Sequence, residues 1–149
     1  MKNLLNYNDR ESILSRLQSL QAGNQRKWGK LTVQEILPHL TDPFRAAMHE
    51  KPGAPQKSPL YNTLLGKAMR NFVPWPKSAP TDPGFLPGTG MTPPTDFDHD
   101  KQTLLLTIHR FVHFDGLLAE HSVFGPMDHR AWGRLMWRHL DHHLRQFSA

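Results

Sequence analysis

Hydrophobic residues recur at every third or fourth position in four long stretches of the chain, which is the spacing of one face of an α-helix. The first stretch begins near Asn8 or Asp9, either of which can cap a helix, and Gly23 is well placed to end it. Its apolar stripe consists of Ile13, Leu14, Leu17 and Leu20. The pattern therefore predicts a first helix within residues 8–23.

A second helix is predicted behind Thr32-Val-Gln-Glu35, because a Thr followed three residues later by a Glu is typical of a capping box. Pro38 and Pro43 each remove a backbone donor, so we expect a kink or a local break that could turn His39 inward. The apolar positions of this stretch are Val33, Ile36, Leu37, Leu40, Phe44, Ala47 and Met48.

The middle of the chain changes character. A short helix is predicted from Pro59 through Phe72, with an apolar side made of Leu60, Leu64, Leu65, Ala68, Met69 and Phe72. Residues 74–94 then hold seven prolines and three glycines, which excludes a helix or an interior strand. Because this stretch also carries Trp75, Phe85, Leu86 and Met91, we interpret it as an ordered loop, either a structural crossover or a lid over one end of the fold.

Two further helices complete the pattern. Thr95 or Asp96 can cap a helix that ends near Gly116, and Asp128 can cap the last one. The inward residues of the former are Phe97, Leu104, Leu105, Ile108, Phe111 and Val112. No repeat or convincing strand pattern is present, so the sequence predicts an all-α four-helix bundle with a long proline-rich crossover loop, in a single domain over residues 1–149.

The last helix carries histidines within its apolar stripe. His139 and His143 are one turn apart on the face that also holds Trp132, Leu135, Met136, Leu140 and Phe147, so both rings can reach one point in the core. His142 projects to the edge of this stripe. Four other side chains are predicted to lie toward the solvated face: Arg134, Arg138, Asp141 and Arg145.

A metal ion is one candidate for the point where the two rings meet, but a helix pair supplies only two ligands. A third is needed, and His39 on the second helix can supply it, because bundle sites are built from facing helices. The other interpretation is that these histidines are hydrogen-bonded polar residues of the core. The chain has no cysteine, so a transition-metal site has to use His with Asp or Glu.

Charge and hydropathy argue against two classes of partner. The net charge of +5 is spread thinly and no nucleic-acid recognition motif is present, so we expect no nucleic-acid partner. No apolar run is long enough to span a bilayer and the N-terminal residues do not resemble a signal peptide, so we expect no membrane partner and a cytoplasmic location.

Four segments carry a resemblance to a known family: Trp28-Gly-Lys-Leu-Thr32 with His39 downstream, Pro74-Trp-Pro-Lys-Ser-Ala-Pro80, His121-Ser-Val-Phe-Gly-Pro126, and Trp132 to Phe147. Together they resemble the bacterial domain of unknown function 1569, within the DinB/YfiT-like metalloenzyme superfamily. The resemblance implies a DinB-like four-helix bundle that holds a divalent metal with His39, His139 and His143. It leaves the metal open among nickel, zinc, iron and manganese.

This resemblance gives the first functional hypothesis, a metal-dependent enzyme that transfers a low-molecular-weight thiol to an electrophile or hydrolyses a small molecule. The alternatives are a non-catalytic metal- or ligand-binding bundle with a stress-related role, and a structural or nucleic-acid-binding bundle. The partner is expected to be a small molecule, with a homodimer left open. No catalytic base is assigned.

Three more residues are candidates for supporting roles. Glu35 and Asp42 can each orient an imidazole N–H, although Glu35 already serves the capping box and Asp42 points away from the apolar stripe. His121 is either at the rim of the pocket or exposed in a loop.

Overall fold

The computed structural model describes residues 1–53, 57–73, 77 and 83–147, and these form five α-helices and one short 3-10 helix. The elements are α1 (Tyr7–Ser19), α2 (Ile36–Ala47), α3 (Leu64–Phe72), η1 (Pro83–Phe85), α4 (Phe97–Val112) and α5 (His129–Gln146). The described residues contain no β-strand, only an isolated bridge between His121 and Gly125. The prediction of an all-helical fold is therefore confirmed for this part of the chain.

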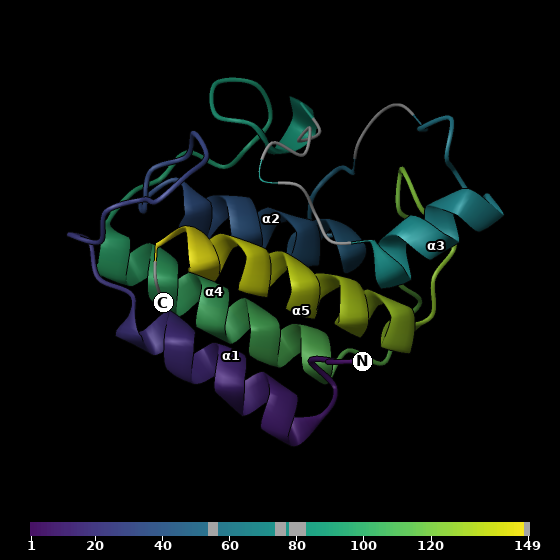
Figure 1. The fold of residues 1–149 in the computed structure, drawn as a ribbon, viewed down its shortest axis with the longest axis horizontal. Coiled ribbons are helices and arrows are strands. Elements are labelled where there is room, and N and C mark those ends of the chain that lie inside the picture. Colours follow the sequence, from purple (N-terminus) through teal and green to yellow (C-terminus); the bar gives the residue numbers. More distant parts are fainter. Residues whose placement is uncertain (54–56, 74–76, 78–82, 148–149) are drawn as a thin grey trace.

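The four longer helices lie side by side, and α3 lies at one end of them (Figure 1). Helix α2 packs most extensively against α4, while α5 contacts both α1 and α2. The core between them is made of large apolar side chains that are fully buried, among them Phe44, Phe111, Phe147, Leu4, Ile13, Leu17, Leu20, Ile36, Leu37, Leu40, Leu104 and Ile108. This packing places one face of α5 directly against α2.

The helix boundaries follow side-chain caps, which differ from the predicted ones in α1. The side chain of Asn6, and not of Asn8 or Asp9, caps α1 by accepting a hydrogen bond from the backbone N–H of Asp9 at 3.1 Å. Asp9 cannot serve as the cap because its carboxylate lies inside the first turn, where it pairs with Lys2. Helix α1 also ends earlier than predicted, because Leu20 turns into an extended conformation before Gly23.

The caps of the later helices agree better with the sequence. Asp96 caps α4 and Asp128 caps α5, with backbone donors at 3.0 and 2.6 Å. Helix α4 ends at Val112, four residues before the predicted stop at Gly116. Its last turn is closed by the backbone N–H of His113, which donates to the His109 carbonyl oxygen.

The predicted capping box before α2 is confirmed. The backbone N–H of Thr32 donates to the Glu35 carboxylate at 2.8 Å, and the N–H of Glu35 donates to the Thr32 hydroxyl at 3.2 Å. The expected break in this helix is absent. Pro38 lies in the first turn, where a missing donor costs little, and α2 continues through Pro43 to Ala47.

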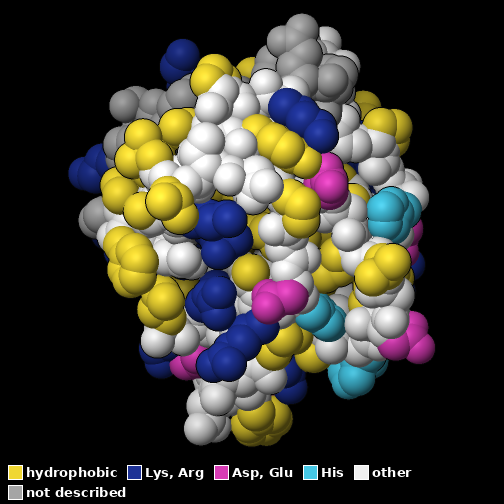
Figure 2. Space-filling view, turned by 90° about the vertical axis from the view of Figure 1, so that its right-hand side faces the viewer, with side chains coloured by type: hydrophobic (Ala, Val, Ile, Leu, Met, Phe, Trp, Pro, Cys, Tyr) yellow, Lys and Arg dark blue, Asp and Glu magenta, His cyan; other side chains and the backbone are white. Residues whose placement is uncertain are grey.

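Helix α3 differs most from the prediction. It begins at Leu64 instead of near Pro59, because Thr63 caps it and the residues before form turns. Its expected apolar side is largely exposed: Leu64, Leu65, Met69 and Phe72 all face solvent, since α3 lies at the edge of the fold and packs on α5. Figure 2 views this side of the molecule, where hydrophobic side chains lie next to Lys and Arg side chains.

Part of the proline-rich crossover can be described. Residues 74–76, including Trp75, and 78–82 lie outside the described residues. The remainder packs on α2 through η1, and Met91 is buried. Asp42 of α2 anchors this segment, since its carboxylate accepts hydrogen bonds from the backbone N–H and hydroxyl of Thr92 at 2.8 and 2.7 Å. Among the helices described, none combines the length and hydropathy needed to cross a membrane.

Candidate metal centre

Three histidines from two helices converge on one point. The Nε2 atom of His39 on α2 lies 3.1 Å from Nε2 of His143 and 3.2 Å from Nε2 of His139, both on α5. One nitrogen from each ring lies within 4.8 Å of the others. The structure thus brings together the three histidines that the sequence had singled out.

These distances match the requirements of a shared ion. With metal–nitrogen bonds of about 2.1 Å, two nitrogens at neighbouring positions of a tetrahedral or octahedral ion are about 3.0–3.5 Å apart. The two Nε2 separations at His39 fall in this range. The three histidines could therefore hold a divalent transition metal.

The helices explain why the rings meet. His139 and His143 are separated by four residues on α5, so both point to the same side of that helix. His39 lies in the second turn of α2, which packs against this side of α5. His39 and His143 are buried, and His139 is half-buried.

The ring of His39 is held by the crossover. Its Nδ1 lies 2.9 Å from the backbone carbonyl oxygen of Phe85 in η1. A carbonyl oxygen can only accept, so Nδ1 carries the hydrogen and donates it. The neutral ring then has its lone pair on Nε2, which faces the other two histidines.

The ring of His143 is held by its own helix. Its Nδ1 lies 2.7 Å from Oε1 of Gln146, one turn further along α5, and donates a hydrogen bond to it. The Nε2 lone pair of His143 is thereby also directed at the cluster. Hydrogen bonds of this kind fix the tautomer and orientation of metal-binding histidines.

Gln146 is itself held by the segment that precedes α2. The backbone N–H of Lys27 donates to the backbone carbonyl oxygen of Gln146 at 2.7 Å. Gly29 has a φ of +85° and packs so closely on Gln146 that a Cβ there would lie 2.3 Å from the amide nitrogen. The bend at Lys27 and Gly29 thus supports the residue that orients His143.

Burial keeps the three rings neutral. It lowers the pKa of His39 below the usual 6.5, against the opposing effects of the Phe85 carbonyl and the Asp42 carboxylate. Burial, with the nearby His39 and His142 rings, lowers the pKa of His143 to about 3 although its bond to Gln146 acts in the other direction. The pKa of His139 is lowered well below 6.5 by burial and by the surrounding histidines. Neutral imidazole is the form that binds metal.

Two other histidines lie near the cluster. His142 lies outside it, as predicted, and its ring packs edge-on against Trp28 with centroids 4.8 Å apart. His121 is half-buried against Phe124 and Trp132, so the alternative of an exposed loop histidine is wrong. Burial, with a smaller effect of Arg70, lowers the pKa of His121 to about 4, and this ring is close enough to influence His139.

The expectation that Glu35 or Asp42 orients an imidazole is wrong. Glu35 is engaged in the capping box, and both oxygens of the buried Asp42 carboxylate accept hydrogen bonds from Thr92. The Nδ1 atoms of His39 and His143 instead donate to Phe85 and Gln146 respectively. The spacing of Gln146 three residues after His143 was a usable signal, whereas no pattern in the sequence links Phe85 to His39.

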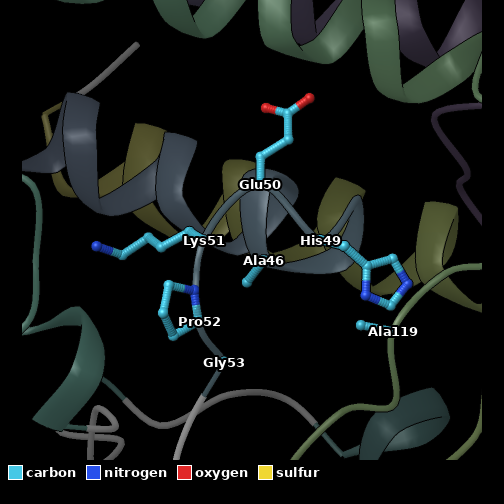
Figure 3. Close-up of a pocket in the computed structure, with 7 residues that line it drawn as sticks. All are labelled: Ala46, His49, Glu50, Lys51, Pro52, Gly53 and Ala119. Carbon is cyan, nitrogen blue, oxygen red and sulfur yellow. The ribbon is translucent and has the colours of Figure 1, made fainter.

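A cavity of about 420 Å³ lies away from the histidine cluster, at the end of α2 (Figure 3). Its His49, Glu50 and Lys51 side chains point in different directions, and each has a structural partner. His49 contacts the Leu117 carbonyl oxygen at 3.0 Å, Glu50 pairs with Arg110, and Lys51 donates to the Gly90 carbonyl oxygen. These groups do not converge on a common ligand.

Comparison with known proteins gives a family for the whole chain. The model of the family described as protein of unknown function (DUF1569) matches residues 1–149, so the chain belongs to this family. Searches of curated proteins and of solved structures found no match. The family carries no assigned activity, and the histidine cluster is therefore the main guide to function.

Proposed function

We propose that this protein is a metal-dependent enzyme of the DinB-like type, a single four-helix-bundle domain over residues 1–149. In this proposal His39, His139 and His143 hold one divalent transition metal: nickel, zinc, iron or manganese. The reaction is transfer of a low-molecular-weight thiol to an electrophile, or hydrolysis of a small molecule. A cytoplasmic location and a small-molecule partner remain predictions.

The observation that carries the proposal is the opposition of two lone pairs. Because Phe85 and Gln146 accept the Nδ1 hydrogens, the Nε2 atoms of His39 and His143 have no hydrogen to place between them in their neutral state. Two bare nitrogens 3.1 Å apart repel each other unless a cation lies between them. The lowered pKa values of the rings disfavour a proton in that role, and this supports a metal ion as the shared cation.

The donor set supports an open site. Structural zinc sites are usually closed by four protein ligands, often thiolates, whereas three histidines leave room for water or substrate. A metal held in this way lowers the pKa of bound water or of a thiol and polarises an electrophile. The chain's own contribution is to fix the ring tautomers through Phe85 and Gln146 and to exclude water around the two buried rings.

Turnover separates an enzyme from a non-catalytic metal-binding bundle. The protein, loaded separately with nickel, zinc, iron or manganese, is tested with glutathione, bacillithiol or mycothiol and a set of electrophiles, and with small esters and amides. We expect turnover with at least one combination that is lost on chelation and in His143→Ala. Metal binding without any turnover would favour the non-catalytic bundle.

A further inference from the structure

A second cavity, of about 260 Å³, lies between the N-terminus, α3 and α5. Its lining includes four cationic side chains, Lys2, Arg70, Arg134 and Arg138, and no acidic one. Met1, Asn71, Phe72 and Trp137 complete the wall. None of these residues belongs to the histidine cluster.

The position of the arginines departs from the sequence prediction. Arg134 and Arg138 were expected to lie on the solvated face of α5, but both are half-buried because α3 packs over them. Asp141, expected on the same face, is buried and pairs with Arg16 and Arg145. The acid nearest to Arg138 in the sequence is thus already paired with other cations.

The four cations are not equally compensated. Lys2 pairs with Asp9 at 2.8 Å. Arg138 donates to the backbone carbonyl oxygens of Arg70 and Val73, at the end of α3, and so joins the two helices. Arg134, by contrast, has a buried Nε with no hydrogen-bond partner among the described residues.

A buried guanidinium N–H without an acceptor is costly, and most such groups in proteins have a partner. Burial, together with the repulsion from the nearby Arg134, lowers the pKa of Arg70. The Asp128 carboxylate acts in the opposite direction on this pKa, but it already caps α5. Arg70 donates from Nε to the Asn71 side-chain oxygen at 3.4 Å, so the unsatisfied donor is Arg134 Nε. The cavity is therefore lined by positive charge that no acidic residue of its lining balances.

We propose that this cavity binds a small oxyanion, the phosphate or carboxylate group of a small molecule, through Arg134 and Arg70. The planar guanidinium group presents several N–H donors to such oxygens and is well suited to both groups. The cavity is smaller than the roughly 300–1,000 Å³ of a drug-sized ligand site, so it suits a small anion or one end of a larger molecule. The aromatic walls of Phe72 and Trp137 suit an organic substituent on that anion.

The test uses chelator-treated full-length protein, so that its result does not depend on the histidine cluster. Inorganic phosphate and succinate are each titrated against chloride at equal ionic strength, and binding is followed by calorimetry and by the thermal midpoint. We expect saturable binding of at least one of the two, accompanied by a rise in the midpoint. Binding of phosphate alone or of succinate alone identifies the preferred group.

Two variants and a matched control locate the site. Arg134→Gln and Arg70→Gln should each weaken binding at least about tenfold, because a charge-assisted hydrogen bond is lost. Arg130→Gln removes the same charge from an exposed position on α5 that does not line the cavity, and it should bind as the wild type does. If Arg134→Gln fails to fold by circular dichroism, Arg70→Gln decides the question. No saturable binding, or equal losses in the control, would overturn the proposal.

Discussion

The Nε2 atoms of His39 and His143 lie 3.1 Å apart although the two residues are separated by 104 positions in the chain. Each ring is oriented toward the other by a hydrogen bond at its far nitrogen, to Phe85 and to Gln146 respectively. Because both Nε2 lone pairs point into the same small space, the arrangement is suited to a cation shared between α2 and α5.

The first prediction distinguishes the three histidines in the last two turns of α5, His139, His142 and His143. His139→Ala and His143→Ala should each reduce bound metal to below about a tenth of the wild-type level, since two remaining ligands hold a divalent ion poorly. His142→Ala is the matched control, because His142 lies outside the cluster and packs on Trp28. Metal content measured by plasma mass spectrometry on untagged protein checks this, and equal losses in all three variants would show that the ligand pair is assigned wrongly.

The second prediction concerns Gly29. A Cβ at this position would lie 2.3 Å from the Gln146 amide nitrogen, and the φ of +85° is unfavourable for any other residue. Gly29→Ala should displace Gln146, lower the free energy of unfolding by about 1–3 kcal/mol and weaken metal binding by about 10–100-fold.

The control for this variant is Gly23→Ala, because nothing lies within 4 Å of the added methyl group and its φ is not positive. Zinc titration and urea unfolding of both variants provide the comparison. Unchanged zinc affinity in Gly29→Ala would mean that Gln146 does not control the orientation of His143.

The third prediction is a pH dependence of the metal-free protein. The unfolded chain has ordinary imidazole pKa values near 6.5, whereas burial lowers those of His39, His139 and His143 in the folded state. Below about pH 6.5 the unfolded state binds more protons, so the free energy of unfolding should fall by up to about 1.4 kcal/mol per pH unit for each such histidine.

Urea unfolding of chelator-treated protein at pH 7.5, 6.5 and 5.5 measures this fall. The contribution of the cluster is complete above pH 6.5, so little of it should be lost between pH 7.5 and 6.5. His143→Gln should show a shallower decline than the wild type. A wild-type stability that is flat between pH 6.5 and 5.5 would contradict the burial of three neutral rings.

The convergence of His39, His139 and His143 could be predicted from the sequence because it follows from helix geometry, whereas their role as metal ligands stays a prediction. His139 and His143 interrupt an apolar stripe at a spacing that only a helix brings to one side, and a facing helix with His39 was available. The presence of the four longer helices could be predicted from the same periodicity.

The surroundings of the cluster could not be predicted in this way. The Phe85 carbonyl reaches His39 only through the path of the crossover, and the burial of Arg134 and Asp141 depends on where α3 and α1 pack. Periodicity also assigned α3 an inward apolar side. A periodic pattern shows that one side of a helix is apolar, but it does not show whether another element covers that side.

The fourth prediction concerns metal and heat. Because zinc or nickel binds the folded site and not a preformed site in the unfolded chain, either metal should raise the thermal midpoint at neutral pH. A free metal concentration 100-fold above the Kd corresponds to a gain of about 2.7 kcal/mol in the free energy of unfolding. Differential scanning calorimetry of chelator-treated wild type and His139→Ala checks this, and an equal rise in the variant would place the metal elsewhere.

The most direct measurement of the central claim is the zinc X-ray absorption spectrum of wild-type protein loaded with one equivalent of zinc. The account predicts a first shell that contains three imidazole nitrogens at about 2.0–2.1 Å, completed by oxygen from solvent. The characteristic outer-shell scattering of imidazole should be lost in part in His39→Ala. A first shell of oxygen ligands without imidazole scattering, or a protein that retains no zinc after desalting, would contradict the claim that His39, His139 and His143 form a metal centre.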